Sequence, residues 1–124
     1  MNILIVDDTS INRVICSRLL DSLGYRNEVA EGGREVVELM KERYHDFDII
    51  FTDCQMPGMD GYEMTRVIRR YEQENKLPAK PIIALTANAH RSDRDLCFEA
   101  GMSDFLSKPF RKPEIDSCIK KWSS

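Results

Sequence analysis

The sequence predicts an α/β fold, in which helices cover both faces of an open parallel sheet. Two observations predict it: five short apolar runs follow one another along the chain, and the segments between them carry apolar residues at helical spacing. A strand and helix repeated five times, (βα)5, implies parallel strands joined by right-handed crossovers, hence a doubly wound sheet. No linker divides the 124 residues, so we expect a single domain over residues 1–124.

The five apolar runs are the expected strands. Three of them are rich in Ile, Val or Phe, as strands usually are, and the second and fifth are less apolar. The expected strands are Asn2 to Val6, Arg26 to Ala30, Asp48 to Thr52, Pro81 to Thr86 and Asp104 to Ser107.

The first two helices are predicted from apolar stripes. In the first helix Ser10 is the expected N-cap and Gly24 the left-handed stop, and most of the stripe should face the core. The stripes consist of Ile11, Val14, Ile15, Leu19 and Leu23 in the first helix, and of Val36, Val37, Met40 and Tyr44 in the second.

Boundary residues place the remaining helices. The third should run from about Tyr62 to Tyr71, followed by a polar connector up to position 80. Ser92 with Asp95 three residues later resembles a capping pair for the fourth helix, which a glycine at position 101 would end. Pro113 fits the first turn of a last helix that reaches about position 122.

Charge and cysteine spacing exclude several classes of protein. Lys and Arg total 18 against 21 for Asp and Glu, and no basic run argues for direct nucleic-acid binding. No apolar stretch approaches the roughly 18 residues that a membrane span needs, and the N-terminus lacks a basic leader, so we expect a cytoplasmic location without direct membrane contact. The four cysteines form no CxxC pair and are expected to be reduced thiols.

Polar side chains follow the expected strands where each one ends. Asp7 and Asp8 follow the first, Asp53 the third and Lys108 the fifth, and Thr86 ends the fourth. Ligands of such sheets bind beyond the carboxyl ends of the strands, so these residues should share one rim. Two carboxylates 4 Å apart repel by about 4 kcal/mol at an effective dielectric near 20, so a cation is needed, and oxygen ligands with room for water favour Mg²⁺.

This set of groups matches the demands of phosphoryl transfer. One carboxylate attacks phosphorus, while a metal ion and Lys108 neutralise the phosphoryl oxygens and Thr86 donates a hydrogen bond to one of them. The expected product is an aspartyl phosphate.

Four sequence blocks give the chain a specific resemblance to a known family. ILIVDD, FTDCQMPGMDG, ALTANA and DFLSKPF occur in the order and at the spacing of the receiver domain of two-component response regulators, so the chain resembles that domain over its full length. The resemblance implies a flavodoxin-like sheet with strand order 2-1-3-4-5.

The resemblance also implies a role for each site residue. Asp53 matches the phospho-acceptor; Asp8 and Asp53, with the backbone carbonyl of Gln55, match the Mg²⁺ ligands, and Asp7 acts mainly through water. Thr86 matches the switch hydroxyl, Lys108 the phosphate-binding lysine and Phe105 the switch aromatic. Lys108–Pro109 matches a position that is usually cis. Phe105 in place of the frequent Tyr, together with Gln55 and Asn88, departs mildly from the commonest pattern and is expected to tune rates.

Three alternatives remain beside this interpretation. A flavodoxin-like FMN carrier would use the same sheet, but Asp7 and Asp8 in its first loop would repel the flavin phosphate. An aspartate phosphatase would need a DxD arrangement and a lid domain, and a receiver-like scaffold that is never phosphorylated would have lost the acids or the lysine. His45 and His90 have no partner at metal-ligand spacing and receive no role.

The run TANAHRSDRDLCFEAGMSDFLSKPF looks most like receivers of hybrid sensor histidine kinases, with a free-standing response regulator as the alternative. The expected partner is a histidine kinase or a histidine phosphotransfer domain, and the location is either the cytoplasm or the cytoplasmic part of a membrane-bound kinase.

The chain ends 16 residues after Lys108, so no DNA-binding output domain is expected. Phosphorylation should shift a conformational equilibrium at the surface of the fourth helix, fifth strand and fifth helix. Ile11, Val14 and Ile15 are the expected docking residues for a histidine-bearing helix.

Overall fold

The computed structural model describes residues 1–87, 91–108 and 110–123, with the side chains of all of these except positions 91 and 92. The strands are β1 (Asn2–Val6), β2 (Arg26–Ala30), β3 (Ile49–Asp53), β4 (Ile82–Thr86) and β5 (Asp104–Ser107). The helices are α1 (Ser10–Ser22), α2 (Gly33–Arg43), α3 (Gly61–Glu74), α4 (Arg91–Ala100) and α5 (Lys112–Trp122), with a short 3₁₀ helix, η1 (Tyr44–Asp46).

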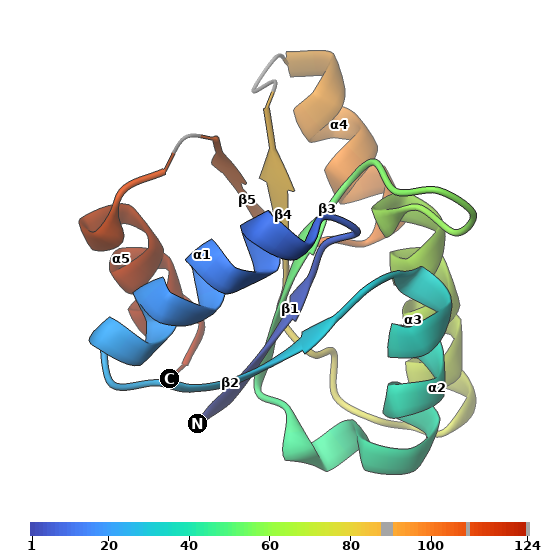
Figure 1. Ribbon diagram of the computed structural model, residues 1–124. Helices are drawn as coiled ribbons and strands as arrows, with labels where there is room; N and C mark the ends of the chain where they lie inside the picture. The colour runs from blue at the N-terminus through green and yellow to red at the C-terminus, as the bar shows by residue number, and fades with distance from the viewer. Residues whose placement is uncertain (88–90, 109, 124) are drawn as a thin grey trace.

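The five strands form one parallel sheet in the order β2-β1-β3-β4-β5, which confirms the predicted α/β fold and strand order (Figure 1). The central strands β1, β3 and β4 are almost entirely buried, as continuous apolar runs in a doubly covered sheet should be. In the register Val6 lies beside Thr52, so the residues that follow β1 emerge next to Asp53 at the end of β3.

Two apolar layers hold the helices to the sheet. Helices α1 and α5 cover one face of the sheet, where the core includes Ile5, Leu20 and Ile119 (Figure 1). Helices α2, α3 and α4 cover the other face, where the core includes Met40 and Ile68. No helix of the described residues is both long enough and apolar enough to cross a bilayer.

The prediction that most of the apolar stripe of α1 faces the core is wrong for the first half of this helix. Ile11, Val14 and Ile15 are 64%, 47% and 59% exposed, while the buried residues of the helix are Cys16 and Leu20. A step of four residues advances about 40° beyond a full helical turn, so a stripe at this spacing winds around the helix. Its C-terminal members reach the core, and its N-terminal members face solvent.

Three predicted helix boundaries also differ. Thr9, with extended backbone, is the N-cap of α1, and Ser10 is the first helical residue. Helix α3 continues to Glu74 and does not end at Tyr71, because the side chain of Glu72 is buried in a hydrogen-bonded network. Ser92 lies inside α4, which begins at position 91, so it is not the N-cap.

Strands β3 and β4 each begin one residue later than predicted, and β3 ends one residue later, whereas the remaining predicted helix ends agree with the structure. Gly24 and the glycine at position 101 have φ of +85° and +101°, the left-handed conformation in which glycine ends a helix without strain. Pro113 lies in the first turn of α5. All four cysteines are free and buried, and His45 is exposed, whereas His90 lies outside the described residues.

Candidate functional site

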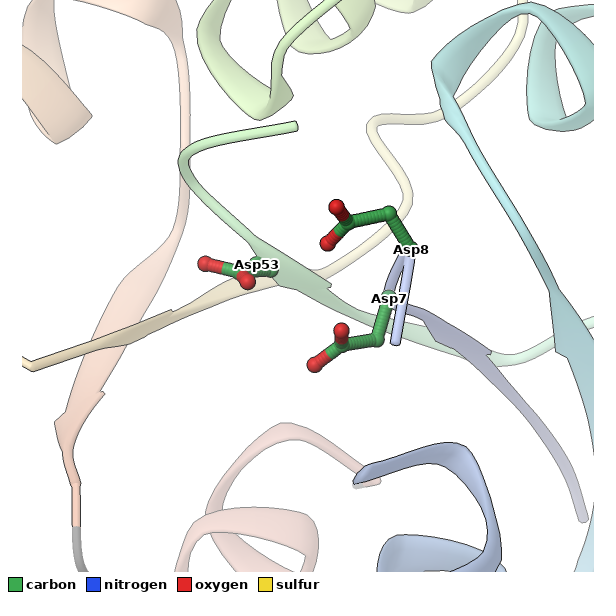
Figure 2. Close-up of side chains that lie close together, drawn as sticks. All are labelled: Asp7, Asp8 and Asp53. Atoms are coloured by element: carbon green, nitrogen blue, oxygen red, sulfur yellow. The ribbon is translucent and has the colours of Figure 1, made fainter. Parts of the chain in front are cut away.

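Three carboxylates meet at the carboxyl edge of the sheet. Asp7 and Asp8 follow β1 and Asp53 ends β3, and one oxygen of each lies within 4.8 Å of the other two. Figure 2 shows the three side chains leaving the ends of these neighbouring strands. The predicted cluster is therefore present, and it forms because parallel strands end at a common edge.

The three carboxylates differ in their surroundings. Asp7 is buried, and its Oδ1 accepts a hydrogen bond of 2.9 Å from the backbone N–H of Thr9. Asp8 is exposed. Asp53 is partly buried, and its Oδ1 accepts a longer bond of 3.3 Å from the backbone N–H of Gln55. Local turns thus orient Asp7 and Asp53, and Asp8 faces solvent.

Lys108 brings one positive charge to the cluster. Its Nζ lies 3.7 Å from Oδ2 of Asp7 and 3.7 Å from Oδ2 of Asp53. Its backbone N–H donates a bond of 2.7 Å to the carbonyl of Thr86, which extends the pairing of β4 with β5 and fixes where the lysine leaves the sheet. One ammonium against three carboxylates leaves two negative charges uncompensated.

Burial, more than this charge imbalance, makes Asp53 a weaker acid. Burial raises the pKa of Asp53 most; the amide of Gln55 and the charge of Lys108 lower it, and the charges of Asp7 and Asp8 raise it further. The net pKa lies above the ordinary value for Asp. The fold therefore disfavours the ionised form of Asp53 unless a cation is near.

The donor set fits a hard divalent cation. Mg²⁺ prefers oxygen ligands at about 2.0–2.1 Å, so two ligand atoms on one ion lie at most about 4.2 Å apart. Carboxylate oxygens of Asp8 and Asp53, the expected direct ligands, are within 4.8 Å of each other, and small side-chain rotations would bring them into that range, with Asp7 close enough to act through water. Gln55, whose carbonyl is the expected third protein ligand, lies two residues after Asp53 and lines the same cavity.

A cavity of about 220 Å³ opens beside Asp53. Thr86, Lys108 and Gln55 form part of its wall, as the sequence predicts for groups that contact a phosphoryl group. Asn88 and the Lys108–Pro109 peptide bond, which the sequence also singles out, lie outside the described residues.

Four residues of this cavity wall were not predicted: Cys54, Tyr62, Ala87 and Asp93. Cys54 and Ala87 directly follow predicted site residues, so their positions could have been inferred from adjacency. Tyr62 and Asp93 come from the first turns of α3 and α4, and no spacing in the sequence shows which side of those turns faces the site.

Gly61 explains how α3 can begin against the acceptor loop. A Cβ atom at this position would lie 2.4 Å from the carbonyl oxygen of Asp53, closer than real Cβ atoms approach, and only 3.1 Å from Cα of Cys54. The N–H of Gly61 donates a bond of 3.0 Å to the carbonyl of Cys54. The glycine at the end of FTDCQMPGMDG is therefore required by this close approach.

The predicted switch aromatic lies behind the cavity wall. Phe105 pairs with Ala84 in the sheet, so it shares a face of the sheet with Thr86 on the neighbouring strand. It is partly buried against the core under α2, α3 and α4. The ring of Phe98 meets it edge-on at 6.3 Å, and the guanidinium of Arg94 lies 5.6 Å from its centre.

The predicted docking residues lie on the other side of Lys108, on α1. Ile11, Val14 and Ile15 are exposed, and Ile15 lines a second cavity of about 650 Å³ between α1 and the segment after β5. Asp7 and Lys108 also line this second cavity, together with the polar residues Asn12 and Arg18. Of the three, Ile15 therefore lies beside Asp7 of the acidic cluster.

Comparison with known proteins identifies relatives over nearly the whole chain. Hybrid signal transduction histidine kinase L of Dictyostelium discoideum is 41% identical over 121 residues, which cover 97% of this chain and 7% of that protein. The chain thus spans only a small part of the curated relatives that it matches.

Solved structures show the same fold. The receiver domain of sensor histidine kinase PA1611 from Pseudomonas aeruginosa PAO1, solved with a magnesium ion coordinated in its active site cleft, is 40% identical with a TM-score of 0.84, and the match covers 98% of this chain and 95% of that one. The receiver domain of the response regulator Ssk1, in a co-crystal with the Saccharomyces cerevisiae histidine phosphotransfer protein Ypd1, is 30% identical with a TM-score of 0.91, over 98% of this chain and 88% of that one.

A family model agrees with these relatives. The model of the response regulator receiver domain matches residues 3–120. This chain belongs to the response regulator receiver domain family, the receiver domains of two-component phosphorelays.

Proposed function

We propose that residues 1–124 form one receiver domain that accepts a phosphoryl group on Asp53 from a histidine of a kinase or a phosphotransfer protein, in a reaction that depends on Mg²⁺. The observation that carries the proposal is the cluster of Asp7, Asp8 and Asp53 with Lys108 at the mouth of a cavity that Thr86 lines. Isolated acids at strand ends are common, but acids, ammonium and hydroxyl around one cavity match the needs of phosphoryl transfer.

In the proposed reaction a carboxylate oxygen of Asp53 attacks phosphorus. A P–O bond to Asp53 forms as the P–N bond to the partner's imidazole breaks, and the electron pair of that bond stays on the imidazole nitrogen. Lys108, 3.7 Å from Asp53, neutralises charge on the transferred oxygens, and the hydroxyl of Thr86 donates a hydrogen bond to one of them. Asp8, Asp53 and the carbonyl of Gln55 would hold Mg²⁺, with Asp7 acting through water, and the bound ion supplies further neutralisation of the phosphoryl charge.

The phosphoryl group then shifts a conformational equilibrium. Thr86 moves toward it, which leaves room for Phe105 to turn inward, and the surface of α4, β5 and α5 changes for a partner. Phe105 has no hydroxyl, so this surface signals through packing.

The proposed partner docks on α1. Ile11, Val14 and Ile15 are exposed apolar residues of α1, and Ile15 shares a cavity with Asp7 of the acidic cluster, so this surface suits a histidine-bearing helix. Ssk1, a relative with this fold, was crystallised with a histidine phosphotransfer protein, which supports this kind of partner. Similarity to hybrid kinases supports a hybrid sensor histidine kinase as the parent protein, with a free-standing regulator as the alternative.

Transfer of radiolabelled phosphate from a histidine-phosphorylated phosphotransfer domain tests the function. The wild type should take up the label and Asp53→Asn should not. Ile11→Ala and Val14→Ala should slow this transfer without changing phosphorylation by acetyl phosphate, which needs no docking surface. Leu96→Ala, an exposed apolar residue of α4, is the matched control. An unchanged rate of transfer to the α1 variants would show that these residues do not form the docking surface.

A further inference from the structure

Helix α4 presents one carboxylate to the cavity in which the phosphoryl group would lie. Asp93 is in the first turn of α4, is partly buried, and lines the same 220 Å³ cavity as Asp53, Thr86 and Lys108. We propose that Asp93 is a positioning residue that opposes the phosphoryl group on Asp53, so that phosphorylation displaces the first turn of α4. This inference rests on the proposed function and deepens it.

Among the side chains that the structure describes, none carries a positive charge paired with Asp93. The cation of the cavity wall, Lys108, already lies against Asp7 and Asp53 at 3.7 Å. The described side chains, those of residues 1–87, 93–108 and 110–123, form no ion pair with Asp93. A phosphoryl group that enters the cavity therefore meets an unneutralised carboxylate on the α4 side.

Before phosphorylation the same carboxylate favours the observed position of α4. An acid in the first turn of a helix interacts favourably with the free N–H groups and the positive end of the helix dipole. A phosphorylated residue adds about 1.5 to 2 negative charges. The residue that stabilises the start of α4 in the unmodified protein would thus repel the new group.

The rest of α4 is placed to transmit such a displacement. Cys97, one turn after Asp93 on the same side of the helix, is buried in the core and anchors the helix there. Arg94 and Phe98 of the same helix contact the ring of Phe105. A shift of the first turn about this anchor would change how the helix holds the switch aromatic.

Titration with beryllium trifluoride in the presence of Mg²⁺ tests the repulsion, because this anion imitates a phosphoryl group without hydrolysing. Asp93→Asn should bind it roughly fivefold more tightly than the wild type, which corresponds to about 1 kcal/mol of relieved charge repulsion. Asp93→Glu, which keeps the charge, should stay within about twofold of the wild type. Asp95→Asn makes the same change at an exposed position of the same helix and should also leave the affinity unchanged.

A merely structural role at the helix terminus gives a different result. In that case Asp93→Asn would lower the melting temperature and would leave the affinity for beryllium trifluoride unchanged or weaker, and this outcome overturns the inference. If the wild type itself binds no beryllium trifluoride with Mg²⁺, the proposed function fails first and the inference fails with it.

Hydrogen exchange tests the displacement. Addition of the same anion should speed amide exchange in the first turn of α4 in the wild type, and much less in Asp93→Asn. An equal change in both proteins would show that Asp93 does not couple the site to α4.

Discussion

At the scale of single residues, the site depends on how one ammonium is shared. Lys108 lies at equal distances of 3.7 Å from Asp7 and Asp53, so it offsets the repulsion between them and still faces the cavity beside Asp53. Lys108 and a metal ion at the cluster would therefore interact with the same carboxylates. Their roles differ, because Lys108 contributes to phosphoryl transfer and is not needed to bind the metal ion.

Replacement of Lys108 by methionine separates these tasks. We expect the rate of phosphorylation by acetyl phosphate to fall about 100-fold or more, because one group that stabilises the transition state is removed. Affinity for Mg²⁺, measured by calorimetry, should be retained or increased, since the cluster gains a net negative charge. Lys112→Met, at an exposed position of α5, is the control. Loss of Mg²⁺ binding in Lys108→Met would contradict this division of roles.

Five of the residues that the sequence predicted for the site share one property. Asp7, Asp8, Asp53, Thr86 and Lys108 all stand at strand ends, and the parallel sheet alone brings strand ends together. Other residues of the site come from helices. The places of Tyr62 and Asp93 depend on how α3 and α4 rotate against the sheet, and that rotation follows from core packing and not from a local pattern.

At the scale of secondary-structure elements, a buried polar network ties α3 to its neighbours. Glu72, only 3% exposed, accepts hydrogen bonds from the hydroxyl of Tyr44, from the backbone N–H of Lys80 at 2.8 Å and from Arg69 at 2.8 Å. Arg69 also donates to the carbonyls of Lys80 and Gly101, each at 2.8 Å. The network therefore joins α3 to η1, to the connector before β4 and to the turn before β5.

Removal of Arg69 should destabilise the protein strongly. Arg69→Ala leaves the buried carboxylate of Glu72 without its ionic partner, and breaking such a pair costs about 3 kcal/mol or more. Arg70→Ala, at the next and exposed position of α3, should change the free energy of unfolding by less than about 0.5 kcal/mol. Urea unfolding of both variants measures the difference, and equal stabilities would show that the network contributes little.

A second tie holds the end of α5 to the start of β5. Asp104 accepts hydrogen bonds from Nε1 of Trp122 at 3.0 Å and from the N–H of Phe105 at 2.9 Å, and Nζ of Lys121 lies 3.3 Å away. Burial raises the pKa of Asp104, but these bonds and the charge of Lys121 outweigh it, so the pKa lies below the ordinary 3.8.

This lowered pKa predicts a pH dependence of stability. The ionised form of Asp104 stabilises the fold above pH 3.8, and this contribution is lost as the pH falls through the lower pKa of the folded protein. Asp104→Asn should therefore unfold more easily than the wild type at pH 6, and the difference should shrink toward pH 2. Thermal unfolding across this range measures it, with exposed Asp95→Asn as control. A difference that stays constant with pH would mean that the charge of Asp104 is not involved.

Helices α1 and α3 show which features could not be predicted from the sequence. The stripe on α1 was visible, but its winding around the helix placed Ile11, Val14 and Ile15 in solvent and left the core contact to Cys16 and Leu20. Helix α3 was predicted too short, because Glu72 looks like a polar connector residue. Its burial depends on partners that are 28 residues away or, for Lys80, eight residues away in the chain.

At the scale of the whole molecule, the alternation of strands and helices was enough to predict a parallel sheet covered on both faces. It was not enough to predict the order of the strands, because right-handed crossovers permit several orders. The order β2-β1-β3-β4-β5 followed only from the four blocks shared with receiver domains. That order makes β1 and β3 neighbours, and only then do Asp7 and Asp8 meet Asp53.

The central claim is that this juxtaposition lets Asp53 carry a phosphoryl group. The most direct measurement is the intact mass of the protein after incubation with acetyl phosphate and Mg²⁺, compared with Asp53→Asn and with a sample that contains a chelator. We predict one phosphoryl group on the wild type and none on Asp53→Asn or on the chelated sample. An unmodified wild type, or equal modification of all three samples, would contradict the claim.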